Sequence, residues 1–228
     1  MRLLFCNIAW MNYYKGIIPG LDEPYGGGSY VLENKDAHEK YNFDPVRVRF
    51  EDGEEQDVCF GFTETKMARS GKKQDLHIEK IEGCEACTKE ACIEDVTVIY
   101  CAARPYQNFT SVVGWYRHAN VYRQYQELVL PQPDGSDYYQ YYNAEAMKEN
   151  CVLLPKDERR ITQWNVPRRQ KGAAFGFGQA NVWFAEGRRE NKLLDEFIRK
   201  TIDKIENYQG ENWIDFDPES VNRRRQGR

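Results

Sequence analysis

The sequence predicts an α+β protein with a compact, β-barrel-like core and one amphipathic helix near its C-terminus. Three observations lead to this prediction. Many short segments have the composition or the period-two alternation of β-strands. Aromatic residues make up 14% of the chain, and such large rings suit the faces of a β-sheet. Only one long segment, close to the end, shows the apolar period of a helix.

The clearest strand signal is VRVRF at residues 46–50, which alternates strictly between apolar and charged side chains. A turn at 51–54 and a return strand at 58–62 complete a predicted hairpin. Further strands are predicted at 3–10, 29–33, 77–81, 96–102, 110–115, 120–130 and 180–185. Residues 131–142 are a turn-rich, tyrosine-rich excursion, and a short helix is expected at 144–150.

The predicted helix runs from about residue 190 to 208. Apolar residues recur there every three or four positions, and charged residues fill the other face. The length fits one domain at 1–210, followed by a polar, basic tail at 211–228 that ends in NRRRQGR.

The bulk composition limits the expected surroundings and partners. A net charge of −4 creates no global field for a polyanion, so any such attraction must be local. No stretch approaches the roughly 18 apolar residues of a membrane span, and the start lacks the pattern of a secretion signal. Seven cysteines without an export signal favour reduced thiols. We therefore expect a cytoplasmic protein with no membrane partner.

Two aromatic stretches, residues 96–126 and 159–185, contain none of the 36 acidic residues. Random placement would put about nine acidic residues there. Phosphates favour arginine and lysine without competing carboxylates, and unstacked bases favour flat rings. The predicted nucleic-acid-binding residues are Trp115, Tyr116, Arg117, Arg123, Trp164, Arg168, Arg169, Lys171 and Trp183. The alternative is that these strands lack acids because they are buried.

Four cysteines form a C-x2-C-x4-C-x8-C arrangement: Cys84, Cys87, Cys92 and Cys101. Four thiolates could bind one structural zinc ion, and the first two could form a redox pair. Only one of the two paired CxxC knuckles of a strong zinc signal is present. The interpretation we favour is therefore ordinary thiols with no cofactor.

Enzymatic activity is disfavoured, although the sequence leaves it open. The three histidines are not paired at metal-ligand spacing, and no catalytic residue is assigned. One alternative is a nuclease or other hydrolase whose site is assembled from scattered acids such as Asp95 and Glu127. Another is a protein-interaction or sensor domain that docks through the tyrosines of residues 138–142.

Several blocks resemble regions of bacterial proteins of modification-dependent restriction. They are VVGWYRHANVYR at 112–123, CVLLP at 151–155 followed by Glu158-Arg159, VPR at 166–168 and GQANVWF at 178–184. Such regions are similar to EVE, YTH and other PUA-like domains, β-barrels that hold a modified base in an aromatic cage. The resemblance implies a reader of modified DNA or RNA, acting alone or with a nuclease partner in trans. It assigns no individual cage residue, so the residues named above rest on their chemistry.

Overall fold

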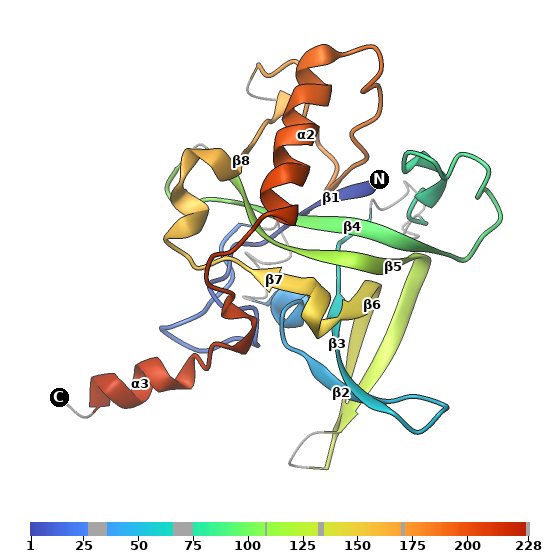
Figure 1. Cartoon of the computed structure of the whole chain (residues 1–228). Coiled ribbons are helices and arrows are strands. Elements are labelled where there is room, and N and C mark those ends of the chain that lie inside the picture. Colours follow the sequence, from blue (N-terminus) through green and yellow to red (C-terminus); the bar gives the residue numbers. More distant parts are fainter. Residues whose placement is uncertain (27–35, 66–74, 108, 132–134, 170–171, 227–228) are drawn as a thin grey trace.

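One mixed β-sheet forms the framework of the protein in the computed structural model (Figure 1). The structure describes residues 1–26, 36–65, 75–107, 109–131, 135–169 and 172–226. Within these residues the sheet has nine strands in the order β2-β3-β6-β5-β4-β1-β9, with β7 and β8 also paired to β5. The strands are β1 (Arg2–Ile8), β2 (Val46–Arg49), β3 (Glu55–Gly61), β4 (Cys92–Ala103), β5 (Thr110–Pro131), β6 (Asp137–Met147), β7 (Cys151–Leu153), β8 (Asn165–Val166) and β9 (Val182–Trp183).

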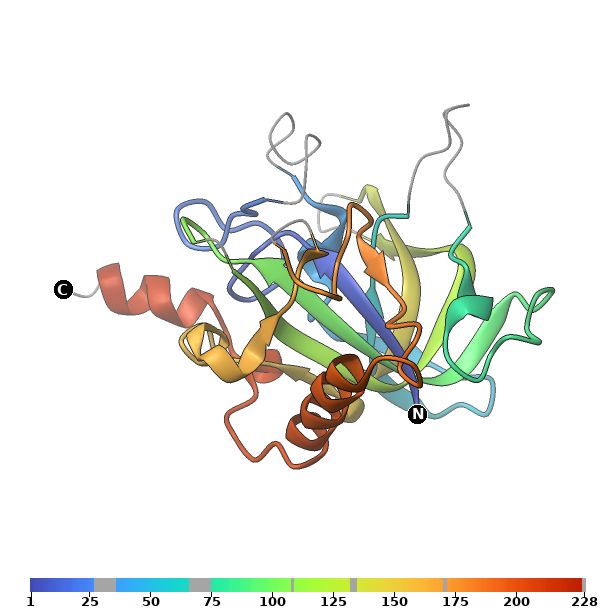
Figure 2. The same cartoon turned by 90° about the horizontal axis from the view of Figure 1, so that it is seen from above.

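Helix α2 (Lys192–Glu206) lies against the part of the sheet that contains β1 and β4 (Figures 1 and 2). Its buried residues Leu194, Ile198 and Ile205 lie on one face, which explains the apolar period of the sequence. A second helix, α3 (Glu219–Gln226), follows near the C-terminus. Short 3-10 turns lie at His38–Tyr41, Ile78–Lys80, Lys148–Asn150, Glu158–Arg160, Thr162–Trp164 and Trp213–Asp215.

Strand β1 lies between β4 and the edge strand β9, and most of its residues are buried. It pairs in parallel with β4, from Arg2 opposite Val96 to Ile8 opposite Ala102, and antiparallel with the short β9. Both of its faces are covered, so its nearly continuous apolar sequence is that of a two-sided core strand.

The two faces of the sheet form separate cores. The tyrosine core contains Tyr14, Phe43, Tyr100 and Tyr116, whose rings meet edge to face or at a tilt. The tryptophan core lies under α2 and contains Trp115, Trp164, Trp183, Phe5 and Ile198. Successive residues of β1 point to opposite faces, so Leu4 and Cys6 enter the tyrosine core and Leu3 and Phe5 enter the tryptophan core. In β5 the alternation is interrupted where its register with β4 shifts, opposite Tyr100 and Cys101.

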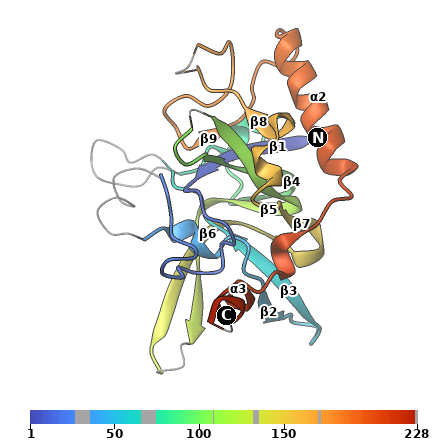
Figure 3. The ribbon, with the colours of Figure 1, turned by 90° about the vertical axis from the view of Figure 1, so that its left-hand side faces the viewer.

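Strand β5 pairs with β4, β6, β7 and β8. Its register with β6 shifts between Val121 and Gln126, and beyond this irregularity the β5–β6 ribbon extends away from the sheet (Figure 3). A Cβ at Gly114 would lie 2.4 Å from the carbonyl oxygen of Val152, so the absence of a side chain there allows β7 to pair so closely.

The β-rich class, the 46–62 hairpin and the C-terminal helix are confirmed. The described strands form an open sheet with edges at β2 and β9, and it is not closed into a barrel. The predicted strand at 77–81 is wrong, because local hydrogen bonds form a 3-10 turn at Ile78–Lys80. The predicted helix at 144–150 is also wrong, because β6 continues to Met147. The strand predicted at 29–33 lies outside the described residues.

The segment after residue 210 is only partly a polar tail. Ile214 is buried in the tyrosine core, and the ring of Trp213 stacks on Tyr13 at a centroid distance of 5.4 Å. The side chain of Asn212 accepts hydrogen bonds from the backbone N–H groups of Leu153 and Ile214 and donates one to the carbonyl oxygen of Cys151. Residues 212–214 are therefore anchored to β7.

Candidate nucleic-acid interface

The four aromatic residues predicted to bind a base lie in the interior of the protein. The exposed fractions are 1% for Trp115, 0% for Tyr116, 2% for Trp164 and 8% for Trp183. Tyr116 belongs to the tyrosine core and the three tryptophans to the tryptophan core, on opposite sides of the sheet. These rings therefore do not form one open pocket. The alternative explanation of the acid-free stretches, burial of the strands, accounts for these four rings.

The predicted cations are also in different places. Arg117 lines a cavity beside α2, and Arg168 lines another cavity near β8. Arg123 is paired with Glu79, its Nη1 lying 2.6 Å from Oε2. Arg169 is exposed, and Lys171 lies outside the described residues. The four arginines, which are described, therefore do not form the rim of a single pocket.

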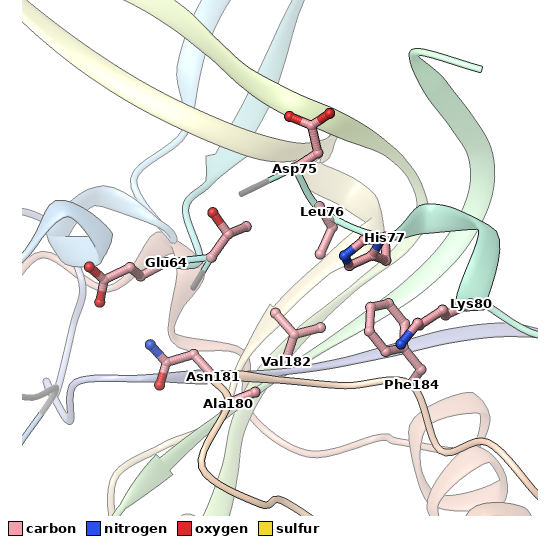
Figure 4. Close-up of a pocket in the computed structure, with 10 residues that line it drawn as sticks. Glu64, Asp75, Leu76, His77, Lys80, Ala180, Asn181, Val182 and Phe184 are labelled. Atoms are coloured by element: carbon pink, nitrogen blue, oxygen red, sulfur yellow. The ribbon is translucent and has the colours of Figure 1, made fainter. Parts of the chain in front are cut away.

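A pocket of about 250 Å³ lies beside the edge strand β9 (Figure 4). We call it the β9 pocket. It is lined by Glu64, Thr65, Asp75, Leu76, His77, Lys80, Ala180, Asn181, Val182 and Phe184. Because side chains alternate along a strand, Trp183 enters the tryptophan core while Val182 and Phe184 pack beside the tyrosine core. The same alternation that buries Trp183 thus gives the pocket an apolar wall.

Figure 4 shows how these side chains are arranged. Val182 and the rings of His77 and Phe184 lie around the middle of the pocket, whereas the carboxylates of Glu64 and Asp75 lie farther out. A small flat group could contact the rings, and polar groups at the rim could bond its edge. The sequence reasoning missed this pocket because its walls come from three separate segments.

Hydrogen bonds fix one wall of the β9 pocket. His77 Nδ1 lies 2.9 Å from Glu79 Oε1, and the ammonium of Lys80 lies 6.0 Å from the centroid of the Phe184 ring. Burial by itself would raise the pKa of Glu79, but hydrogen bonds from its own backbone N–H, Arg123 and His77 lower it to about 2. Glu79 is therefore a carboxylate near neutral pH, and it links His77 to Arg123.

A second cavity of about 330 Å³ lies between β8 and α2, and we call it the arginine cavity. It is lined by Phe109, Thr110, Asn165, Val166, Pro167, Arg168, Ala173 and Phe197. The guanidinium of Arg168 donates hydrogen bonds to the side-chain oxygens of Thr110 and Asn7. Asn7 also bonds to Asn181, its backbone N–H lying 2.6 Å from the Asn181 carbonyl oxygen. Since Asn181 lines the β9 pocket, Asn7 connects the two sites.

The four candidate zinc ligands do not converge. Cys84 belongs to the tyrosine core and Cys101 to the tryptophan core, on the other side of the sheet. Cys92 and Cys101 lie near opposite ends of β4. Throughout the described ranges, no group of three or more His, Cys, Asp or Glu residues is placed to hold a metal ion. Burial raises the pKa of both Cys84 and Cys101, which favours the neutral thiol in each case.

A histidine–aspartate pair lies at the opposite end of β1 from Asn7. His118 Nδ1 lies 2.7 Å from Asp95 Oδ1, and the two residues have positive φ angles of 51° and 58° where the β4–β5 register shifts. The pair borders a cavity of about 300 Å³ together with Arg117 and Glu206. Glu127, the other acid of the hydrolase alternative, lies nine residues beyond His118 along β5, so Asp95 and Glu127 do not share a site.

No helix in the described part of the chain is long and apolar enough to cross a membrane. A scan against protein-family models, a search of curated proteins and a search of solved structures each found no match.

Proposed function

We propose that this chain is a nucleic-acid-binding module that takes one unstacked or modified base of DNA or RNA into the β9 pocket. The observation that carries the proposal is the juxtaposition, in one concave site, of the Phe184 ring with polar side chains from three segments. The resemblance of the sequence to PUA-like readers of modified bases leads to the same proposal by a separate route. The site residues differ from those that the sequence predicted.

The size and chemistry of the β9 pocket suit a nucleobase. Pockets for drug-sized ligands start at about 300 Å³, so a pocket of about 250 Å³ fits a smaller ligand. Every base has a face that can stack on an aromatic ring such as Phe184. Carboxylates such as Glu64 and Asp75 can accept hydrogen bonds from the exocyclic amino group of cytosine or adenine.

The charges around the β9 pocket favour one side of it for the nucleic-acid backbone. Glu64 and Asp75 repel phosphate, whereas Arg168 is joined to Asn181 at the pocket through Asn7. The base would therefore enter between the rings while the backbone passes on the side of Arg168. Arg168 would supply a positive charge on that side, although the net charge of the whole chain is −4.

The test is the binding of labelled single-stranded and duplex DNA and RNA, plain and base-modified, followed by fluorescence anisotropy. We expect affinity that falls as salt rises, because phosphate binding releases counterions. Phe184→Ala should weaken binding by about tenfold or more, as expected for a lost stacking contact of roughly 1–3 kcal/mol.

Leu193→Ala is the matched control, because Leu193 is a large apolar residue that is 64% exposed on α2. It should bind as the unmodified chain does. Thermal unfolding of both variants separates loss of binding from loss of the fold. If the unmodified chain binds none of these nucleic acids at about 50 mM salt, the proposed function is wrong.

A further inference from the structure

The arginine cavity has an unusual charge environment. Arg104 is only 7% exposed, and it donates hydrogen bonds to the carbonyl oxygen of Arg160 at 3.1 Å and to the side-chain oxygen of Asn165. Its Nε, also buried, has no hydrogen-bond partner among the described residues. Asn165 lines the cavity, so Arg104 lies directly behind the wall in which Arg168 is set.

Neither arginine has an acidic partner in the part of the chain that the structure describes. Within the residues that the structure describes, no carboxylate lies within 4.0 Å of the guanidinium of Arg104 or Arg168, and all their acceptors are neutral oxygens. Burial lowers the pKa of both arginines, and the charge of Arg160 lowers that of Arg104 further. A buried arginine is costly unless a carboxylate is paired with it. Among the described residues, no carboxylate offsets the positive charges of Arg104 and Arg168.

We propose that the arginine cavity binds a phosphate group of the nucleic acid, held by Arg168 and attracted by the charge of Arg104. This inference rests on the proposed function, since it assigns a phosphate of the bound nucleic acid to the arginine cavity, next to the β9 pocket that would hold the base. It goes beyond that function in naming a separate cavity with its own residues.

Several features favour phosphate as the ligand. Two of the five N–H donors of Arg168 are used by Thr110 and Asn7, which fix the orientation of the guanidinium and leave donors for an anion. A fixed arginine fork matches the oxygens of a phosphate. The ring of Phe109, 54% exposed, borders the cavity and offers a surface for the sugar or base attached to that phosphate.

The first experiment uses the unmodified chain. The side-chain N–H signals of arginine are followed by NMR during titration with inorganic phosphate and with a 5′-mononucleotide, and the Arg168 signal is assigned by its loss in Arg168→Gln. We expect both ligands to shift the Arg168 signal, with the mononucleotide acting at the lower concentration. If neither ligand shifts any arginine side-chain signal of the unmodified chain, the inference is overturned, whether or not the variant folds.

The second experiment measures binding of oligonucleotides that carry a 5′-phosphate or a 5′-hydroxyl group. Arg168→Gln should weaken binding about tenfold and reduce the salt slope by about one, because one phosphate contact is lost. If the unmodified chain prefers the 5′-phosphate and Arg168→Gln does not, the cavity binds a terminal phosphate. If Arg168→Gln weakens binding of the 5′-phosphate and 5′-hydroxyl oligonucleotides equally, the cavity binds an internal phosphate. Arg168→Lys keeps the positive charge but lacks the fork of N–H donors. Its affinity should lie between those of the unmodified chain and Arg168→Gln.

Arg199→Gln is the charge-matched control, because Arg199 is an exposed arginine of α2 paired with Asp195. It should change affinity by less than about twofold. If the unmodified chain binds oligonucleotides but Arg168→Gln behaves like Arg199→Gln, this inference fails and the proposed function stands. If phosphate shifts the Arg168 signal but no oligonucleotide binds, the proposed function fails and the cavity is an anion site of another kind.

Discussion

The Nη1 group of Arg159 donates a hydrogen bond to the carbonyl oxygen of Met11 at 2.7 Å, across 148 residues of sequence. Its Nη2 and Nε donate to the carbonyl oxygens of Asn12 and Leu154, each also at 2.7 Å. The carboxylate of Asp22 accepts hydrogen bonds from the backbone of the same loop, including Asn12 N–H. The fully buried Arg159 thus joins the loop after β1 to the segment after β7.

Arg159→Met should lower the free energy of unfolding by about 3–5 kcal/mol. The change removes the donors of three buried carbonyl oxygens and leaves Asp22 without its neighbouring positive charge. Urea unfolding followed by tryptophan fluorescence measures the effect. Arg160→Met is the control, because the side chain of Arg160 is exposed, and it should stay within about 0.5 kcal/mol of the unmodified chain. A loss below about 1 kcal/mol for Arg159→Met would show that water or backbone movement replaces the guanidinium.

Gly61→Ala should lower the free energy of unfolding by about 2 kcal/mol or more. A Cβ at this position would lie 1.9 Å from the hydroxyl oxygen of Tyr100, in the buried tyrosine core. Either the ring or strand β3 would have to move, and overpacking of this kind costs about 1–3 kcal/mol. Gly178→Ala is the matched control, because no atom of the described residues lies within 4 Å of the added Cβ. Equal unfolding midpoints for the two variants would contradict the prediction.

The ion pair of Glu79 and Arg123 should make stability depend on pH in the acid range. The pKa of Glu79 is lowered to about 2 in the folded state, below the unfolded value of about 4.3. The contribution of the Glu79 carboxylate to the free energy of unfolding is therefore complete above the pKa of the unfolded state. It disappears as the pH falls through the pKa of the folded state. We expect Glu79→Gln to cost about 1 kcal/mol at pH 7, after allowance for solvent screening, and to cost much less at pH 2, where the contribution is disappearing.

Unfolding titrations of both proteins across this range provide the measurement. Glu85→Gln is the control, because Glu85 is an exposed acid whose hydrogen bonds come from the backbone N–H groups of Gly83 and of Glu85 itself rather than from an arginine. A difference between Glu79→Gln and the unmodified chain that stays constant from pH 7 to pH 2 would rule out the assigned ion pair.

Asn191→Ala should destabilise α2 by about 1 kcal/mol. The side chain of Asn191 accepts a hydrogen bond from the backbone N–H of Leu194 at 3.1 Å, which satisfies one of the free donors at the start of the helix. Asn191→Asp keeps an acceptor in this place and should retain most of the stability. Amide hydrogen exchange in the first turn of α2 checks the effect, and unchanged protection in Asn191→Ala would argue against the cap.

The sequence by itself determined the features that depend on neighbouring residues. The alternation of residues 46–50 predicts the β2–β3 hairpin, in which Val46 pairs with Val58. The apolar period that includes Leu194 and Ile198 predicts α2 to within two residues at each end. Both signals are periods of side-chain direction, and such periods are fixed by local backbone geometry.

Only the tertiary structure decided which of the predicted site residues remain accessible. Trp115 and Tyr116 point to opposite faces of β5, and each face is covered by elements distant in the sequence. Arg123 is paired with a carboxylate 44 residues away, whereas Arg168, among the described residues, bonds to the neutral oxygens of Asn7 and Thr110. Burial and charge pairing are set by contacts between distant segments. No local pattern could therefore separate a core tryptophan from an exposed ring, or an arginine paired with a carboxylate from one bonded to neutral oxygens.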